Sequence, residues 1–206
     1  MSNTKVQISN GKMAMVVIAI ILLVDQIVKI WVKTNMSIGE TVIQWDAFNI
    51  TWFRMTFLEN NGAAGGMQLF GSKVFLTLFR MIAIGFVGYY LWKLNKRVEP
   101  VRKGFFLTLA LILAGAAGNL IDCLFYGLCF SASTGFDVSQ FVGFAGEGHY
   151  AGFLEGRVVD MFELPFTFIW NIADAAITIG VILLLLVYRN DLNNLLSKNV
   201  HTTSAE

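Results

Sequence analysis

Residues 104–126 read GFFLTLALILAGAAGNLIDCLFY, an apolar stretch in which Asp122 is the only charged residue. A bilayer core of roughly 30 Å takes about 20 helical residues to cross, so this stretch is long enough. The small residues at 114–118 favour close approach of a neighbouring helix. The stretch therefore predicts a tightly packed membrane-spanning helix that carries Asn119 and Asp122 at its far end.

Three further apolar runs, at about 13–32, 74–92 and 166–188, have similar lengths. Of the 206 residues, 56% are hydrophobic and 14% are charged, whereas soluble proteins carry about 25% charged residues. The first run resembles a signal peptide but lacks a small-residue cleavage pattern, so we read it as a retained span. We predict an all-α membrane protein with four transmembrane helices, forming one integral membrane domain over residues 1–206.

The charges of the connecting segments predict the orientation. The connection 93–103 holds five basic residues and one acid, Glu99, so the positive-inside rule places it in the cytoplasm. The segments 33–73 and 127–165 then lie outside, and both termini face the cytoplasm. This orientation is expected of a multi-pass membrane protein with an even number of spans.

The two outer segments differ in composition. In the first, Phe48, Ile50 and Trp52 alternate with polar residues, and alternation resumes in the opposite phase from Phe53, which predicts a small strand-rich extracytoplasmic lobe between helices 1 and 2. Its apolar faces suit the membrane surface or an extended peptide. The second is rich in glycine over 127–156, which predicts a loop that acts as a lid or only as a connection.

Composition argues against several classes of function. The net charge of +1 provides no basic excess for nucleic acid. There is no His-Glu-x-x-His motif, and the two histidines lie in a loop and in the tail, so neither a metal site nor a cofactor is expected. Cys123 and Cys129 lie on different faces of one predicted helix, so no disulfide is expected, and neither thiol has a neighbouring base.

Polar residues cluster at one depth of the predicted bundle. Asp25 with Lys29 is an i,i+4 pair, and Asn119 with Asp122 and Asn171 with Asp174 are i,i+3 pairs. Each pair shares a helix face, and all three fall in the outer third of the bilayer. Ionisable groups there are costly and indicate function. Asp160, six residues before the last span, is expected to bring a second carboxylate near Asp174.

Two carboxylates in one site of low dielectric constant tend to share a proton. One can then accept a proton from water while the other donates a hydrogen bond to the scissile carbonyl oxygen. This pattern favours an aspartic-type endopeptidase. A small proton- or ion-coupled carrier is the main alternative, although the cytoplasmic halves of the last two spans are almost wholly apolar. A structural or assembly protein is a third possibility.

Five short motifs stand in order along the chain: Asp25-Gln-x-x-Lys29, Asn60-x-Gly62-Ala-Ala, Gly118-Asn119-x-x-Asp122, Val158-Val159-Asp160 and Asn171-x-Ala173-Asp174. In these motifs and their order the chain resembles the lipoprotein signal peptidase family (signal peptidase II). The resemblance implies an intramembrane aspartyl protease of the bacterial plasma (inner) membrane, which removes signal peptides from prolipoproteins by cutting before the diacylglyceryl-modified cysteine. It implies that Asp160 and Asp174 are catalytic. The positions implied to bind substrate or support the site are Asp25, Lys29, Asn60, Gly62, Asn119, Asp122, Asn171 and Ala173.

The chain departs from the family pattern in three places. Cys123 stands where the family has Arg after the Gly-Asn-x-x-Asp motif, so we expect the ion pair made by that Arg to be absent or supplied from elsewhere, with Arg157 as the candidate. A segment of 37 residues separates Asp122 from Asp160, where the family connection is short, and Gly65 replaces an aromatic residue. The expected partners are the lipid-modified prolipoprotein and membrane lipid, with the protein acting as a monomer.

Overall fold

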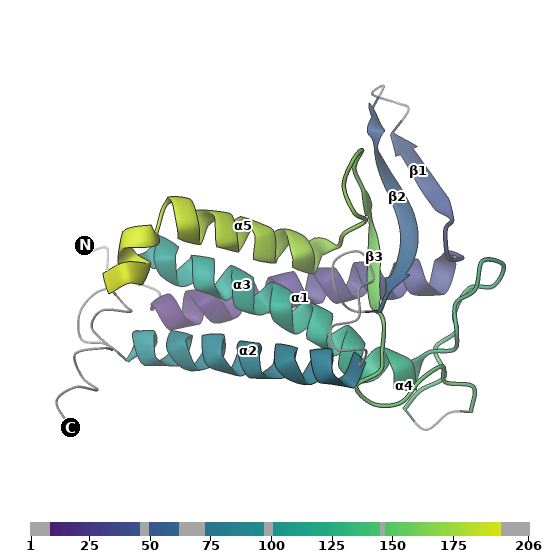
Figure 1. The fold of residues 1–206 in the computed structure, drawn as a ribbon, viewed down its shortest axis with the longest axis horizontal. Helices are drawn as coiled ribbons and strands as arrows, with labels where there is room; N and C mark the ends of the chain where they lie inside the picture. Colours follow the sequence, from purple (N-terminus) through teal and green to yellow (C-terminus); the bar gives the residue numbers. More distant parts are fainter. Residues whose placement is uncertain (1–8, 46–49, 62–72, 97–100, 145–146, 195–206) are drawn as a thin grey trace, which may run out of the picture.

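The computed structural model describes residues 9–45, 50–61, 73–96, 101–144 and 147–194. Apolar helices lie side by side, and a small sheet stands at one end of them (Figure 1). The elements in chain order are α1 (Asn10–Asn35), β1 (Thr41–Trp45), β2 (Ile50–Asn60), α2 (Lys73–Asn95), α3 (Lys103–Ile121), a π-helical turn η4 (Asp122–Tyr126), α4 (Gly127–Cys129), β3 (Val158–Glu163) and α5 (Ile172–Leu186). The chain is mostly helical, as predicted.

Within the described residues, three helical segments are long and apolar enough to cross a membrane: α1, α2 and the continuous stretch Lys103–Cys129, which joins α3, η4 and α4. They match the predicted spans 13–32, 74–92 and 104–126. Large apolar side chains on the outer faces are exposed, including Leu23 in α1, Ile82 in α2 and Leu185 in α5. Extensive exposed apolar faces require an apolar surrounding. The chain is therefore a multi-pass membrane protein.

The last helix is shorter than predicted. α5 begins at Ile172 and has 15 residues, a rise of about 22 Å, whereas the prediction began it at Phe166. Phe166 has a φ of 65°, in the left-handed region. Trp170 forms a β-bridge with Phe162. Residues 166–170 thus form the connection that leads from β3 to α5. The prediction included them in the span because they are mostly apolar.

The sheet has three antiparallel strands in the order β1-β2-β3. β1 and β2 lie between α1 and α2, as predicted for the lobe. The third strand comes from the second outer segment, for which no strand was predicted. Pairing of Asn60 with Val158 places the end of β2 beside the start of β3.

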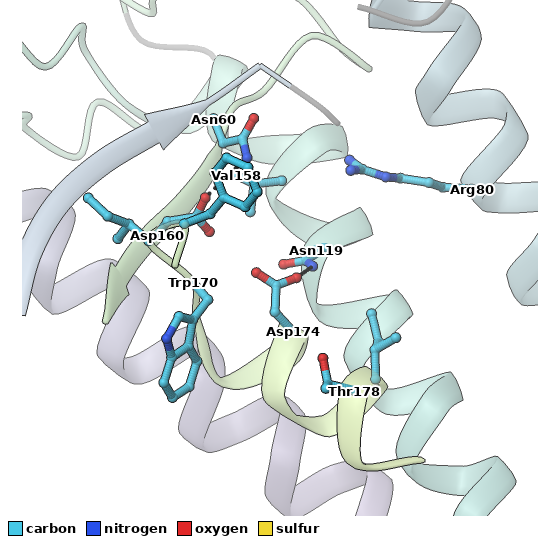
Figure 2. Close-up of a pocket in the computed structure, with 11 residues that line it drawn as sticks. Asn60, Arg80, Asn119, Val158, Asp160, Trp170, Asp174 and Thr178 are labelled. Atoms are coloured by element: carbon cyan, nitrogen blue, oxygen red, sulfur yellow. Dashed lines mark hydrogen bonds between the residues drawn. The ribbon is translucent and has the colours of Figure 1, made fainter. Parts of the chain in front are cut away.

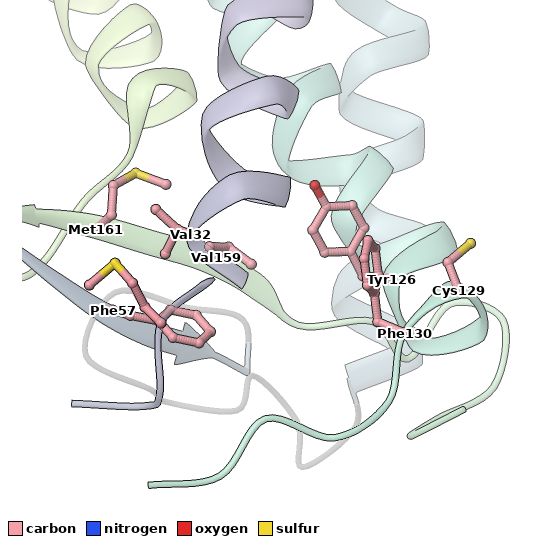
Figure 3. Close-up of a cluster of buried hydrophobic side chains, with 8 residues drawn as sticks. Val32, Phe57, Tyr126, Cys129, Phe130, Val159 and Met161 are labelled. Atoms are coloured by element: carbon pink, nitrogen blue, oxygen red, sulfur yellow. The ribbon is translucent and has the colours of Figure 1, made fainter. Parts of the chain in front are cut away.

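A cluster of buried apolar side chains packs between the sheet and the ends of the helices (Figure 3). Val159 and Met161 of β3 are both fully buried in it. Successive side chains of a strand point to opposite faces, so Asp160 faces the other side. The other buried members of the cluster are Val32, Met36, Phe57, Tyr126, Cys129 and Phe130. Apolar burial on one face of β3 therefore orients the carboxylate on its opposite face.

Small residues bring three helices together near the sheet end. A Cβ added at Gly115 of α3 would overlap the backbone carbonyl oxygen of Ala173 in α5. One added at Gly118 would lie 2.8 Å from Oδ2 of Asp25 in α1. The small-residue run 114–118 thus supports the close approach predicted from the sequence.

Gly115→Ala is expected to destabilise the protein by about 1–3 kcal/mol, because the added methyl group must push α3 away from α5. Thermal unfolding can be followed with a thiol-reactive fluorophore, since Cys123 and Cys129 are free and buried. Gly88→Ala in α2 is the matched control, because a Cβ there meets nothing within 4 Å. Equal melting temperatures for the two variants would contradict the close approach.

Candidate active site

Asp160 and Asp174 line one cavity of about 360 Å³ at the junction of the helices and the sheet (Figure 2). Asp160 comes from β3 and is 1% exposed, and Asp174 lies half-buried in the first turn of α5. A water molecule occupies about 30 Å³ of liquid volume, so the cavity has room for water and for a short extended segment of a ligand. The other lining residues are Asn60, Arg80, Asn119, Val158, Phe168, Ile169, Trp170, Ile177 and Thr178.

Three asparagine side chains hold the two carboxylates. Asn119 Nδ2 donates to Asp174 Oδ1 over 2.7 Å. Asn171 Nδ2 donates to Asp160 Oδ1 over 2.6 Å, and Asn60 Nδ2 donates to Asp160 Oδ2 over 3.2 Å. Amide donors at both carboxylates fix their orientation toward the cavity, and such preorganisation is what catalysis by positioned groups requires.

Asn171 has two roles that its position explains. It is the N-cap of α5, with extended backbone angles, and its Oδ1 accepts a hydrogen bond from Asp174 N over 2.8 Å. Its Nδ2 points the other way and donates to Asp160 and to Asn119. The Asn-x-Ala-Asp motif thus starts the helix, and the Asn171 side chain links the Asp160 carboxylate to the backbone of Asp174.

The surroundings of Asp160 favour its protonated form. Burial raises the pKa of Asp160 to about 7, and the negative charge of Asp174 acts in the same direction. Hydrogen bonds from Asn60 and Asn171 oppose this rise but do not cancel it. An ordinary aspartate is ionised at neutral pH, so Asp160 holds a proton under conditions where an exposed carboxyl would not.

A buried ion cluster contacts Asn119, one of the residues that line the cavity. Lys29 Nζ is 2.9 Å from Asp25 Oδ2 and 2.8 Å from Asp122 Oδ2, and no side chain of the three is more than 1% exposed. Lys29 also donates to Asn119 Oδ1 over 2.9 Å. Asn119 therefore connects the ion cluster to Asp174, and the predicted i,i+4 pair of Asp25 and Lys29 is confirmed.

Asp25 and Asp122 also accept hydrogen bonds from backbone N–H groups next to the two site aspartates. Asp25 Oδ1 accepts a hydrogen bond from Ala173 N over 2.9 Å, and Asp122 Oδ2 accepts one from Val159 N over 3.3 Å. Gln26 Nε2 donates to Asp122 Oδ1 over 2.9 Å. The two accepting oxygens thus hold the residues next to Asp174 and Asp160.

A second ion network lies beside the first, at the end of β2. Glu59 pairs with Lys33 of α1, accepts a hydrogen bond from Ser133 over 2.9 Å, and pairs with Arg157 over 2.9 Å. Burial favours a raised pKa for Glu59, but the charge of Lys33 and the hydrogen bonds from these three residues outweigh it. The pKa of Glu59 therefore lies below its usual value.

Tyr150 joins the long second outer segment to this network. Its hydroxyl accepts a hydrogen bond from Arg157 N over 2.7 Å, and Lys33 Nζ lies 4.7 Å from its ring centroid. Glu59 precedes Asn60 in β2, and Arg157 directly precedes β3. The network thus ties the segment to both strands that approach the cavity.

Most of the predicted site residues meet in one place. A continuous set of hydrogen bonds and ion pairs joins Asp25, Lys29, Asn60, Asn119, Asp122, Asp160, Asn171, Ala173 and Asp174. Gly62 and Gly65 lie outside the described residues. Arg157 was the candidate to supply the charge that the family places after Asp122, but the structure places it against Glu59 and not among the residues that line the cavity.

Two site residues were missed. Gln26 stands inside the first motif, but its contact with Asp122 joins two different helices, so the spacing of residues within one helix could not predict it. Arg80 lines the cavity from α2. A signal for Arg80 was present, because it is a charged residue within the predicted span 74–92, where ionisable groups indicate function.

Comparisons with known proteins agree with these observations. A family model described as signal peptidase (SPase) II matches residues 17–189. The lipoprotein signal peptidase of Porphyromonas gingivalis strain ATCC 33277 is 40% identical over 92% of this chain and 88% of its own length. That of Amoebophilus asiaticus strain 5a2 is 36% identical over 79% of this chain and 72% of its own length.

Solved structures show the same fold. One bacterial membrane enzyme superimposes with a TM-score of 0.61 at 23% identity, covering 88% of this chain and 90% of the other. Another gives a TM-score of 0.59 at 24% identity, covering 85% and 92%. With the matched family model, the similar relatives and the convergent aspartates, the chain belongs to the signal peptidase II family.

Proposed function

We propose that this protein is an aspartic-type endopeptidase that removes signal peptides from prolipoproteins by cleaving before the diacylglyceryl-modified cysteine. The observation that carries the proposal is the convergence of Asp160 and Asp174 on one cavity, each held by an amide donor. Family membership supplies the substrate class, and the two carboxylates supply the chemistry.

In the proposed mechanism the two aspartates share one proton and hold one water molecule between them. The ionised carboxylate takes a proton from the water as its oxygen attacks the scissile carbonyl carbon, and the protonated carboxyl donates to the carbonyl oxygen. The tetrahedral intermediate then collapses, the carbon–nitrogen bond breaks, and the leaving amine takes a proton from the dyad. The groups required are all present in Asp160 and Asp174.

The surroundings of the dyad suit a lipid-modified substrate. A second cavity, of about 300 Å³, shares Trp170, Asp174 and Thr178 with the first and extends along α5 past Ala175 and Ile179. Ile179 is exposed on the outer face of the bundle. We propose that this second cavity receives an acyl chain of the substrate while the peptide lies in the first.

The proposed orientation follows from the charges at the opposite end of the bundle. Lys93, Lys96, Arg102 and Lys103 lie at the turn from α2 to α3, away from the sheet (Figure 1). By the positive-inside rule this end is cytoplasmic, so the sheet and the cavity lie near the outer face of the membrane. We propose that α5, although its 15 residues rise only about 22 Å, makes the fourth crossing, so that both termini face the cytoplasm.

The test is cleavage of a purified diacylglyceryl-modified prolipoprotein by the detergent-solubilised protein, beside the same substrate without the lipid. We expect cleavage of the lipidated substrate before its modified cysteine, and little or none of the other. Absence of cleavage by a protein that shows cooperative thermal unfolding would contradict the proposal. Ion-dependent flux in proteoliposomes, together with that absence, would favour the carrier.

The rate of cleavage is expected to depend on pH through Asp160. Because its pKa is raised to about 7, the dyad keeps its proton below that pH and loses it above. With both aspartates ionised, no carboxyl remains to donate to the carbonyl oxygen, so kcat/KM should fall about tenfold for each pH unit above roughly 7. Steady-state rates between about pH 5.5 and 9 test this, and a flat profile above pH 7 would contradict it.

A further inference from the structure

The stretch 151–156, which we call the return limb, leads back to β3 and packs against the end of the helical stretch Lys103–Cys129. Gly156 N donates a hydrogen bond to the carbonyl oxygen of Cys123 over 2.9 Å. A Cβ added at Gly156 would lie 1.9 Å from the backbone oxygen of Asp122. In Figure 1 the chain passes beside α4 and the adjacent end of α2 before it enters β3. The return limb therefore lies alongside the last turns of a membrane span.

A second contact gives the depth of the return limb relative to α2. Thr77 is buried and lies one helical turn after Lys73, where α2 begins, so it stands about 6 Å inside the helix. Its hydroxyl group donates to the carbonyl oxygen of Leu154 over 3.0 Å. The return limb thus reaches into the layer that the apolar helices cross and does not stop beyond their ends.

Backbone N–H groups of the return limb donate to acceptors within the protein. Gly152 N donates to Oε2 of Glu155 over 3.0 Å, and Glu155 N donates to the carbonyl oxygen of Gly152 over 3.2 Å. Ala151 N donates to the carbonyl oxygen of Gly127 in α4 over 3.2 Å. Irregular backbone is tolerated at membrane depth where the protein satisfies its polar groups. The return limb is therefore compatible with an apolar surrounding.

Two aromatic side chains of the same segment are exposed although they lie beside a span. Phe144 is 67% exposed and Phe153 is 53% exposed. Their ring centroids lie 6.0 and 6.1 Å from that of Phe125, which belongs to η4 and so to the stretch Lys103–Cys129. We call Phe125, Phe144 and Phe153 the aromatic surface. It continues the exposed apolar faces of the helices, and extensive exposed apolar surface requires an apolar partner.

The charges of the segment indicate which kind of lipid the aromatic surface fits. Residues 127–156 contain no Lys or Arg, and their charged residues are Asp137, Glu147 and Glu155. Attraction to anionic headgroups comes from basic residues, so the segment has no such attraction. Apolar side chains that enter the boundary between headgroups and acyl chains bind through the area that they bury. A zwitterionic lipid is therefore a sufficient partner.

We infer that the aromatic surface and the return limb are seated among the lipids of the leaflet at the sheet end of the bundle, where Phe144 and Phe153 contact acyl chains just below zwitterionic headgroups. This contact anchors the segment that directly precedes β3, the strand that carries Asp160. The inference requires a membrane-embedded bundle but not the protease activity, so either can fail without the other.

The test places an NBD fluorophore on Phe144→Cys and, separately, on Phe153→Cys, in phosphatidylcholine nanodiscs that hold one protein each. We expect a lipid with a nitroxide near the top of its acyl chain to quench most of the fluorescence of both variants, and aqueous iodide to quench little. Phe79→Cys is the positive control, since Phe79 is 60% exposed on α2. Asp137→Cys is the negative control, because Asp137 is an exposed polar residue of the same segment, and iodide should quench it more than the lipid does.

Wild type gives the background of this measurement, because its Cys123 and Cys129 are buried. Iodide quenching at positions 144 and 153 as strong as at position 137 would place the aromatic surface in water and overturn the inference. Protection from both quenchers would mean that protein covers the surface, which would also overturn it. Addition of phosphatidylglycerol should leave the quenching by lipid unchanged, and an increase would contradict a contact made by apolar burial alone.

A second measurement needs no fluorophore and follows amide hydrogen exchange of the return limb in the same nanodiscs. Phe144→Leu with Phe153→Leu keeps apolar side chains for the lipid, so exchange should stay close to that of wild type. Phe144→Ser with Phe153→Ser removes them, and exchange of the limb should become about tenfold faster while α3 stays protected, since burial of a Phe side chain shifts an equilibrium by at least that factor. Unchanged exchange in the Ser variant would overturn the inference. So would equal acceleration in both variants, because ring packing on Phe125 would then hold the limb.

Discussion

Asp174→Asn is expected to lower kcat by about 10³-fold or more while the protein still folds. General acid–base groups contribute about 10²–10⁴-fold each, and asparagine can neither accept a proton from water nor share one with Asp160. The substitution preserves the shape of the side chain. It also leaves the start of α5 intact, because Asn171 caps that helix through the backbone N–H of residue 174.

The measurement is single-turnover cleavage of the lipidated substrate, with thermal unfolding of the same preparation as the control for folding. Asp191→Asn is a matched control, because Asp191 pairs with Arg102 at the opposite end of the bundle, and its rate should equal that of wild type. A folded Asp174→Asn protein that keeps more than about a tenth of the wild-type rate would exclude the dyad mechanism.

Lys29→Met is expected to cause the largest loss of stability. Lys29 lies between Asp25 and Asp122, and all three side chains are almost fully buried. Removing the cation leaves two buried carboxylates facing each other, and breaking a buried pair in this way costs about 3–5 kcal/mol. For a chain of this size that corresponds to a fall in melting temperature of about 6–20 °C.

Two further variants separate charge from packing. Lys12 is an exposed residue of the same helix, so Lys12→Met should have the melting temperature of wild type. Combining Lys29→Met with Asp25→Asn and Asp122→Asn removes the unpaired charges, so most of the lost stability should return. A melting temperature for Lys29→Met within about 2 °C of wild type would show that the ion cluster does not hold the helices together.

Much of the site could be predicted because its residues stand in short local patterns. The spacing of Asp25 and Lys29 places them on one helix face, and the structure pairs them. The i,i+3 spacing of Asn171 and Asp174 predicts that they lie together, and Asp174 N donates a hydrogen bond to Asn171 Oδ1. Three of the predicted spans agree with helices of the structure. Long apolar runs predict them well because crossing a membrane requires a certain length and composition but no particular partner segment.

Predictions were weaker where a segment depends on a distant partner. Residues 166–170 have the composition of a span, but Trp170 pairs with Phe162, so these residues form a connection between β3 and α5. Val158–Glu163 follows a glycine-rich segment, and it becomes a strand because β2 provides the hydrogen-bonding edge. Arg157 was the candidate to replace the charge of the family Arg at position 123, but the structure pairs it with Glu59 of β2.

The sequence by itself determined that this is a membrane protein, that its polar residues gather at one depth, and that two aspartates stand in the motifs of a protease family. Only the tertiary structure decided which groups meet. Asp25 holds the backbone of Ala173, 148 residues away, and Arg80 reaches the cavity from a helix whose sequence carries no family motif. The reason is that periodicity reports which residues share a face of one element, whereas packing of small residues between α1, α3 and α5 sets how those faces are turned toward each other.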